Sequence, residues 1–341
     1  MKSLYLFFIF IFCGISQISL AQQDPNSSMW FMSRGLVNPA AVATEIEDVS
    51  FFTNFRYSYF TIDAAPMRTN GFVAEFKVPD KSDRDNNFGI GINAYNDQVG
   101  DSKYMTNSIS IPVSYTLELD FQNKLSIGVS PGFFQQSFNP EAQTWENQWN
   151  GNSFDNTLPN NENFRESYST LDFGTGIFYE LNIRDKSKYY AGLSLKHLTG
   201  QKIDFSFSGS KLYTLLTVNA GADIITKKRN MRISPQVIYT KNGPNNSFII
   251  GTSAETLIDE GSRITNLRKS KSIQYGFYYR VNDAIISTIG FNISGFKAGL
   301  AFDATISNFN EANKSIGAVE LYLKYSFMKK SSKGSKKKKQ K

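Results

Sequence analysis

Apolar and polar side chains alternate along most of this chain after residue 49, in segments of about ten residues. A period of two is that of a β-strand with different surroundings on its two faces, whereas helical periodicity is nearly absent. The cleanest segment, residues 316–327, sets an apolar row against a polar one: Val319, Leu321, Leu323, Tyr325 and Phe327 against Glu320, Tyr322, Lys324 and Ser326. The chain must therefore fold as a sheet, in a register that a slip of one residue would invert.

Fourteen such segments follow one another, and each predicts a strand. They lie at 49–58, 70–78, 87–96, 105–119, 124–138, 169–182, 188–197, 212–226, 231–241, 247–258, 271–281, 284–293, 296–306 and 316–327. An even number returns both chain ends to the same side of a membrane, as single-chain bacterial barrels require. Tight-turn sequences such as Asn282-Asp283 and Ser294-Gly295 join several of them. The connection 259–270 is longer than expected for a periplasmic turn.

The fold class that these strands predict is an all-β transmembrane antiparallel barrel of about fourteen strands. A soluble β-sandwich also alternates, but strands such as 105–119 and 212–226 are longer than the usual five to six residues of soluble strands. The last strand ends on Phe327, and the 29 Phe and 17 Tyr residues suit aromatic girdles at both membrane interfaces.

The N-terminal 21 residues predict export. Lys2 precedes an apolar run of about twelve residues, and Ser19-Leu20-Ala21 forms a small-residue cleavage site. The run is too short for a transmembrane helix, so we interpret residues 1–21 as a signal peptide. The single cysteine, Cys13, is removed with it. Export and a barrel together predict the bacterial outer membrane.

The net charge of +7 is concentrated at the C-terminus. Eight lysines lie between positions 329 and 341 and one lies in the signal peptide, so residues 22–328 carry a net charge of −2. We interpret residues 328–341 as a lysine-rich tail in the periplasm. Nucleic acid is not an expected partner in that compartment. Lys336, Lys337, Lys338 and Lys339 are candidates for binding an acidic partner or membrane lipid; the alternative is a solvated tail without a partner.

Catalytic, cofactor and metal sites are not expected. Hydrolytic barrels need a nucleophile with an oriented base, nearly always histidine, and the only histidine, His197, follows Lys196 at the end of a strand. The mature chain has no cysteine, and the Asp- and Asn-rich stretch 152–166 lacks the spacing of a calcium loop.

The longest connection, residues 139–168, is expected at the cell surface. It carries four aromatic residues among Asn, Gln and Glu: Trp145, Trp149, Phe154 and Phe164. Tryptophan is enriched in binding hot spots, so these residues are candidates for gripping a partner or a glycan. The alternative is that they fold the loop against the barrel mouth.

The order and spacing of several short motifs resemble the PorP/SprF family of outer-membrane proteins over nearly the whole mature chain. The motifs are Gln23-Asp24-Pro25, Val37-Asn38-Pro39-Ala40-Ala41, Phe55-Arg56-Tyr57, Phe88-Gly89-Ile90-Gly91, Asn96-Asp97-Gln98-Val99-Gly100, Leu125-Ser126-Ile127-Gly128-Val129, Gly174-Thr175-Gly176 and Tyr190-Ala191-Gly192-Leu193. The chain departs from the family in its first segment, which contains Arg34-Gly35.

The resemblance implies a FadL-like barrel of fourteen strands that serves the type IX secretion system. Its expected partners are a secreted cargo protein, such as a gliding adhesin, and other secretion components. The barrel is then expected to bind the C-terminal region of that cargo for export or surface anchoring; the alternative is a FadL-like solute transporter. The predicted organisation is a signal peptide (1–21), an N-terminal periplasmic or plug segment (22–48), the barrel (49–327) and the tail (328–341).

We expect mature protein from outer membranes to begin at Gln22 and to migrate faster on a gel before boiling than after it, because a closed barrel resists detergent. N-terminal sequencing and heat-shift electrophoresis check this. A soluble periplasmic product would contradict the barrel.

Overall fold

The structure is a computed structural model that describes residues 24–25, 27–45, 47–62, 66–79, 86–100, 103–159, 166–183, 187–200, 202–203, 210–226, 230–259 and 270–328. The signal peptide, Phe164, most of the connection 259–270 and the lysines of the tail lie outside these ranges.

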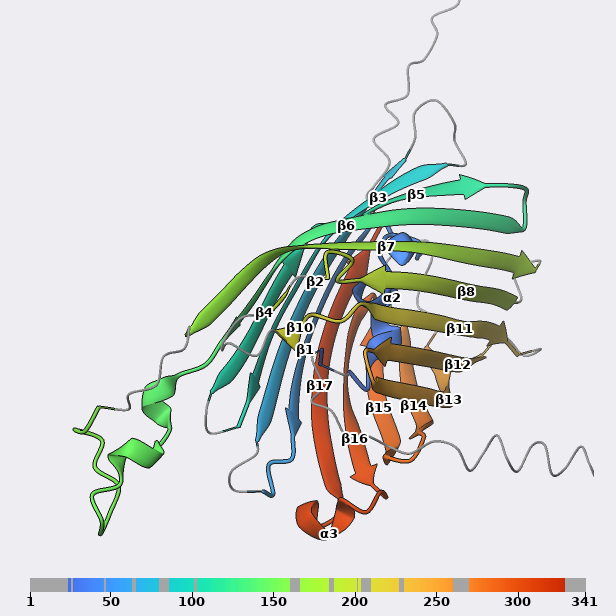
Figure 1. The fold of residues 1–341 in the computed structure, drawn as a ribbon. Helices are drawn as coiled ribbons and strands as arrows, with labels where there is room; N and C mark the ends of the chain where they lie inside the picture. Colours follow the sequence, from blue (N-terminus) through green and yellow to red (C-terminus); the bar gives the residue numbers. More distant parts are fainter. Residues whose placement is uncertain are drawn as a thin grey trace, which may run out of the picture.

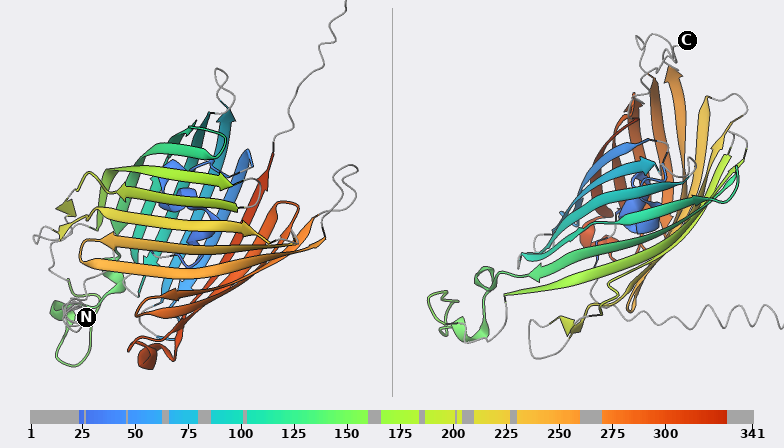
Figure 2. Two further views of the ribbon diagram at one scale, coloured as in Figure 1. Left: turned by 90° about the vertical axis from the view of Figure 1, so that its right-hand side faces the viewer. Right: turned by 90° about the horizontal axis from the view of Figure 1, so that it is seen from above.

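Antiparallel strands form a closed barrel (Figures 1 and 2). Its wall consists of β1 (Val49–Ser58), β2 (Met67–Pro79), β3 (Asn87–Val99), β4 (Tyr104–Ser110), β5 (Val113–Glu118), β6 (Asn123–Ser137), β7 (Ser167–Ile183), β8 (Ser187–Lys196), β11 (Leu215–Ile225), β12 (Met231–Asn242), β13 (Asn245–Asp259), β14 (Lys271–Arg280), β15 (Ala284–Ile293), β16 (Phe296–Thr305) and β17 (Ile316–Phe327). β1 closes the ring on β17, from Val49 opposite Phe327 to Ser58 opposite Ala318. The predicted fourteen-stranded barrel is confirmed, because β4 and β5 share one place in the wall.

Pro112 is the reason why that wall strand is divided. Ser110 lies opposite Asn93 and Val113 opposite Ile90, so the register on β3 is the same on both sides of the break. Proline has no N–H to give to the ladder, although the Pro112 carbonyl still accepts a hydrogen bond from the Gly91 N–H at 2.8 Å. The predicted strand 105–119 therefore occupies one place in the wall, as two strands in the same register. Two short strands, β9 (Lys202–Ile203) and β10 (Ser210–Lys211), pair separately.

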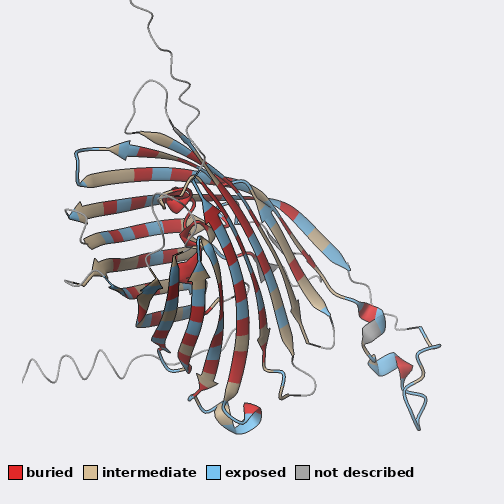
Figure 3. Ribbon diagram, turned by 180° about the vertical axis from the view of Figure 1, so that it is seen from behind, coloured by how far each residue is buried: buried red, intermediate tan, exposed pale blue. Residues whose placement is uncertain are grey.

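The two faces of the wall have opposite character, as the bands of burial in Figure 3 show. On β17 the outward Leu321 and Leu323 are 44% and 39% exposed, whereas the inward Glu320 and Lys324 are 0% and 4% exposed. The apolar outer face suits lipid, and the inward polar groups are shielded by other parts of the protein. Among the described residues, no helix has the length and apolar character needed to cross a bilayer.

The two ends of the barrel differ in their connections. The connection between β6 and β7 carries two short 3₁₀-helices, η3 (Pro140–Ala142) and η4 (Glu146–Gln148), and α3 (Asn310–Asn313) lies at the same end, between β16 and β17. We call this the outer end, because long loops of outer-membrane barrels face the cell surface. β1 begins, and β17 finishes, at the opposite, inner end.

Leu323→Arg is expected to impair assembly, because a charge that faces lipid near the middle of the bilayer costs roughly 2 to 4 kcal/mol. Leu323→Phe keeps an apolar side chain and is the control. Heat-shift electrophoresis of isolated outer membranes measures the folded fraction. Equal folded fractions for both variants would mean that Leu323 does not face lipid.

Candidate functional site

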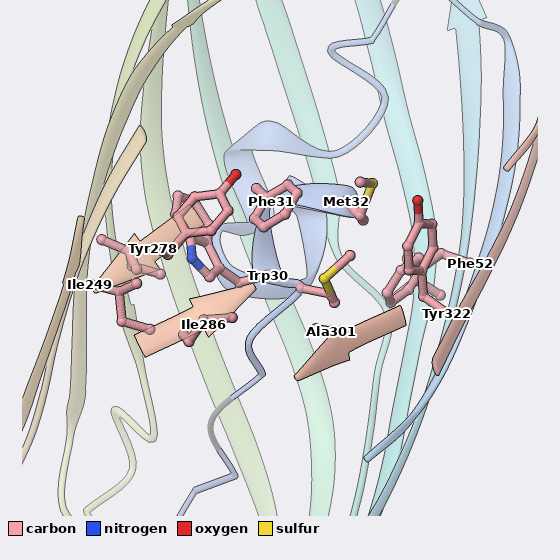
Figure 4. Close-up of a cluster of buried hydrophobic side chains, with 12 residues drawn as sticks. Trp30, Phe31, Met32, Phe52, Ile249, Tyr278, Ile286, Ala301 and Tyr322 are labelled. Atoms are coloured by element: carbon pink, nitrogen blue, oxygen red, sulfur yellow. The ribbon is translucent and has the colours of Figure 1, made fainter. Parts of the chain in front are cut away.

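The N-terminal segment of the described chain lies inside the barrel, and we call residues 24–45 the plug. It contains the 3₁₀-helix η1 (Trp30–Met32), the short helix α2 (Arg34–Val37) and the 3₁₀-helix η2 (Pro39–Ala41). η1 packs its side chains among inward wall residues, as Figure 4 shows, and Phe31 stacks on Tyr278 with 4.8 Å between ring centroids. The middle of the lumen is therefore a packed core.

Ser28 joins the plug to a buried ionic cluster on the wall. Its N–H donates to Glu320 at 2.8 Å, and its hydroxyl donates to Asp303 at 2.8 Å. Arg56 donates to that hydroxyl at 2.7 Å and pairs with both carboxylates, at 2.8 Å to Asp303 and 3.3 Å to Glu320. Arg280 adds a second cation 3.0 Å from Asp303. These charges compensate one another around a plug residue, so none of them is buried without a partner of opposite charge.

Wall side chains also bind the plug through its main chain. Lys196 Nζ donates to the Leu36 carbonyl at 2.6 Å and Ser194 Oγ to the Val37 carbonyl at 2.7 Å. Elsewhere Lys324 Nζ donates to the Met32 carbonyl at 2.7 Å, and Asn93 Nδ2 to that of Gly35 at 2.9 Å. Short helices leave such carbonyls unpaired, so the lumen satisfies groups that the plug cannot satisfy alone.

Glycines of the wall let the plug come close. A Cβ placed on Gly128 would lie 2.6 Å from the main-chain nitrogen of Ala40, and one on Gly176 would lie 2.1 Å from the side-chain oxygen of Asn38. Asn38 caps η2 by accepting the Ala40 N–H, and its amide donates to the Ile177 carbonyl at 3.1 Å. The motif Asn38-Pro39-Ala40-Ala41 and the glycines of β6 and β7 thus form one contact.

An ion pair holds the outer end of the plug. His197 Nε2 lies 3.1 Å from both carboxylate oxygens of Asp24, and its Nδ1 lies 3.0 Å from Asp172. Tyr95 and Asn242 donate to the same Asp24 carboxylate, at 3.0 and 2.5 Å. Burial opposes the charged form of His197, but the carboxylates of Asp24 and Asp172 outweigh it and raise the pKa of His197 to about 10. His197 therefore carries a positive charge at neutral pH.

A second ion pair holds the inner end. Lys324 Nζ lies 2.7 Å from the Glu45 carboxylate. Burial favours the neutral acid, but the charges of Lys324 and Lys297 outweigh it and lower the pKa of Glu45 to about 2. Between the two ends, Arg34 pairs with Asp223 at 3.1 Å and lies over the Tyr190 ring, 3.8 Å from its centroid.

Two of the cavities that the described residues line lie beside the plug. One cavity has a volume of about 320 Å³ and lies between the plug and the outer halves of several wall strands. These strands include β1, β2, β11, β12 and β13, and the lining residues include Asp24 and Ile249. The other, of about 610 Å³, lies toward the inner end and is lined by charges of both signs, including Glu45 and Lys324. Among the described residues, no group of three or more His, Cys, Asp or Glu side chains is arranged to hold a metal ion.

The surface loop with the candidate aromatics extends away from the barrel (Figures 1 and 2). Trp149 and Phe154 are 50% and 51% exposed and face one another edge to face, with 5.1 Å between centroids. Trp145 lies within the loop, where its indole N–H donates to the Pro140 carbonyl at 3.1 Å. The loop thus brings Trp149 and Phe154 together on its surface. Phe164 and Lys336 to Lys339 lie outside the described residues.

The plug contacts were missed by reasoning from sequence alone. The sequence carried a usable signal in the inward-facing positions of the strands. Arg56, Asp303 and Glu320 are charged residues at inward positions, at similar levels along the barrel axis in neighbouring strands. Together with Arg280, their charges cancel, which predicts a cluster. Nothing local to residues 24–45 indicates that Ser28 is its partner.

Solved structures share the barrel fold. The Pseudomonas putida toluene transporter TodX is 7% identical over 86% of this chain and 92% of its own, with a TM-score of 0.50. A Pseudomonas aeruginosa FadL homologue is 11% identical over 85% of this chain and 93% of its own, with a TM-score of 0.49. At these identities the likeness concerns the fold alone.

Sequence comparison gives a closer relationship. No curated protein matches the chain. A family model described as type IX secretion system membrane protein PorP/SprF matches residues 19–325, which include the plug and nearly all of the barrel. The chain therefore belongs to the PorP/SprF family, and its barrel is an outer-membrane barrel.

Proposed function

We propose that this protein is an accessory factor of the type IX secretion system, which binds the C-terminal region of secreted surface proteins, such as gliding adhesins, for export or surface anchoring. The family supports a role in secretion. Other components of the secretion system and outer-membrane lipid are the remaining expected partners. The lysines Lys336 to Lys339 are proposed to contact an acidic periplasmic partner.

The observation that carries this proposal is the way in which the lumen holds its plug. Polar wall side chains donate to consecutive plug carbonyls, at Leu36 and Val37, and ion pairs hold both ends. A solute that crossed the barrel would have to displace these contacts. Such a lumen supports a role that does not depend on conduction.

The exposed pair Trp149 and Phe154 offers a second contact for the cargo. Hot spots of protein interfaces are enriched in tryptophan, and hydrogen bonds within the described part of the loop hold the residues around this pair. Gln148 Nε2 donates to the Leu158 carbonyl at 3.1 Å, and the Thr157 N–H donates to the Asp155 carboxylate at 2.9 Å. An ordered loop loses little conformational freedom when it binds.

The second candidate function is transport of a small solute, which the mixed cavity of about 320 Å³ favours. Deletion of the gene separates the two. Loss of one or a few surface proteins, with general type IX secretion intact, supports the accessory role. An unchanged surface proteome with impaired uptake of a nutrient supports the transporter.

Combined replacement of Trp149→Ala and Phe154→Ala is expected to weaken co-purification of the cargo at least tenfold, because interface hot spots are worth about 2 kcal/mol or more each. The control is Phe121→Ala, which removes an aromatic ring that is 99% exposed at the inner end. Quantitative mass spectrometry after pull-down from detergent-solubilised membranes gives the ratio. Full retention of cargo by the double variant would rule out this contact.

Attachment of the outer end of the plug is expected to depend on pH through His197. Folding raises the pKa of His197, so the stabilisation is complete below about pH 6.5, the ordinary value of histidine, and is lost as the pH rises through about 10. Hydrogen exchange of residues 27–33, corrected for its intrinsic pH dependence, should show this loss of protection. His197→Gln should remove the pH dependence; if that variant keeps it, another group is responsible.

A further inference from the structure

One part of the outward face of the barrel carries a row of uncharged polar side chains. β2, β3, β4, β6 and β7 are neighbours in the wall (Figure 1). Their register places one such side chain of each strand in a single row: Asn70, Asn96, Asn107, Gln135 and Ser169. Tyr95, next to Asn96, reaches the plug residue Asp24. Thr106, next to Asn107, is 3% exposed. Since side chains alternate along a strand, the row faces away from the lumen.

The polar row is confined to this side of the barrel. At comparable distances from the inner ends of their strands, β1, β13 and β14 carry Tyr57, Ile250 and Tyr279 on their outward faces. A girdle at the membrane interface runs around a whole barrel and is aromatic. The carboxamide row is therefore a local feature of the wall from β2 to β7.

A hollow of about 400 Å³ lies between this row and the next one toward the inner end. The next row is apolar and crosses the same strands: Phe72, Ala94, Ile109 and Phe133. The methyl group of Ala94 stands between much larger, exposed side chains, so the surface is hollowed there. Carboxamides from three strands line the hollow together with the apolar groups.

The carboxamides have hydrogen-bonding groups that a ligand can reach. Asn96 Nδ2 donates to Asn107 Oδ1 at 2.7 Å, which leaves the oxygen of Asn96 as an acceptor and the nitrogen of Asn107 as a donor. Asn70 is exposed, and within the described chain its carboxamide has no hydrogen-bond partner. Asn96 and Asn107 are half-buried. The row therefore offers both donors and acceptors at the surface.

A cation lies beyond the row, toward the outer end. Arg68 precedes Asn70 on the outward face of β2 and is exposed. Its guanidinium carbon lies 5.4 Å from the centroid of the Tyr57 ring, and no carboxylate among the described residues forms an ion pair with it. A guanidinium matches the geometry of a phosphate. From the membrane interior outward, this surface thus presents an apolar hollow, carboxamides and a positive charge.

We propose that this surface binds a glycolipid of the outer leaflet, an acylated amino sugar that carries a phosphate. One acyl chain lies in the hollow beside Ala94, hydroxyl and amide groups of the sugar bond the carboxamides, and the phosphate pairs with Arg68. Lipid tails surround the barrel in any case, so the apolar hollow alone selects no lipid. The carboxamide row and Arg68 supply the selection. This inference goes beyond the proposed function, because it involves neither the lumen nor the cargo.

Defined lipids test the inference on the purified protein, stripped of lipid in detergent. Lipid A, an acylated and phosphorylated glucosamine disaccharide, is titrated against its dephosphorylated form and against phosphatidylglycerol, and native mass spectrometry gives the bound fractions. We expect lipid A to bind about tenfold more tightly than either, because charge-assisted and neutral hydrogen bonds act together.

Two variants with matched controls locate the site. Ala94→Leu fills the hollow and is expected to weaken lipid A binding about fivefold or more through a steric clash. Ala304→Leu, at an outward alanine near the outer end of β16, should bind like the unchanged protein. Arg68→Gln should remove the preference for the phosphorylated form, whereas Lys241→Gln, at an exposed lysine of β12, should retain it.

Other outcomes overturn the proposal. Equal binding of lipid A and phosphatidylglycerol means that no sugar is recognised. Unchanged binding in Ala94→Leu, or the same loss in Ala304→Leu, excludes the hollow, and a preference that survives in Arg68→Gln excludes the phosphate contact. Heat-shift electrophoresis verifies that each barrel is folded. If Ala94→Leu does not fold, Asn107→Leu replaces it, and undiminished binding of lipid A by that variant rules out the carboxamide row.

Discussion

Closure of the sheet is the constraint on which the rest of this structure depends. A strand with one face toward lipid must turn its alternate residues inward. In a closed barrel, every strand turns these residues toward the same narrow space. Here that space receives Arg56, Arg280, Asp303 and Glu320. None of them can be left without a partner at such burial. The plug supplies part of what they need through Ser28, so the inward face of the sheet and the N-terminal segment depend on one another.

The plug is held differently at its middle and at its ends. In the middle, contact is close and largely through main-chain groups, with glycines such as Gly128 making room. At the ends, ion pairs of Asp24 with His197 and of Glu45 with Lys324 fix the position along the barrel axis. The departure from the family pattern at Arg34-Gly35 fits this scheme, because Arg34 finds Asp223 and Tyr190, and a Cβ at Gly35 would collide with Glu75.

Sequence alone predicts the wall of this protein well and its interior poorly. Alternation is a local property, so the boundaries of β1, β15 and β17 follow directly from the residues. Pro112 divides its strand only because its nitrogen cannot donate a hydrogen bond. The alternation of apolar and polar residues does not reveal this detail. The plug depends on pairs such as Ser28 and Glu320, which lie 292 positions apart in the chain. Such contacts leave no mark on the neighbouring residues, and the cavity that they leave at Lys196 could not be predicted for the same reason.

The long sequence separation of the plug contacts also bears on how the protein is made. The plug precedes every strand in the chain, yet it lies inside a ring that only the pairing of β1 with β17 completes. Once the ring is closed, a segment with this many wall contacts has no simple lateral way in. We therefore expect the N-terminal segment to be in place before the last strand docks, so that β17 joins a sheet that is already wrapped around it. A segment seated in this order would act as an internal template for assembly, and we expect the barrel to close more slowly when the segment is absent.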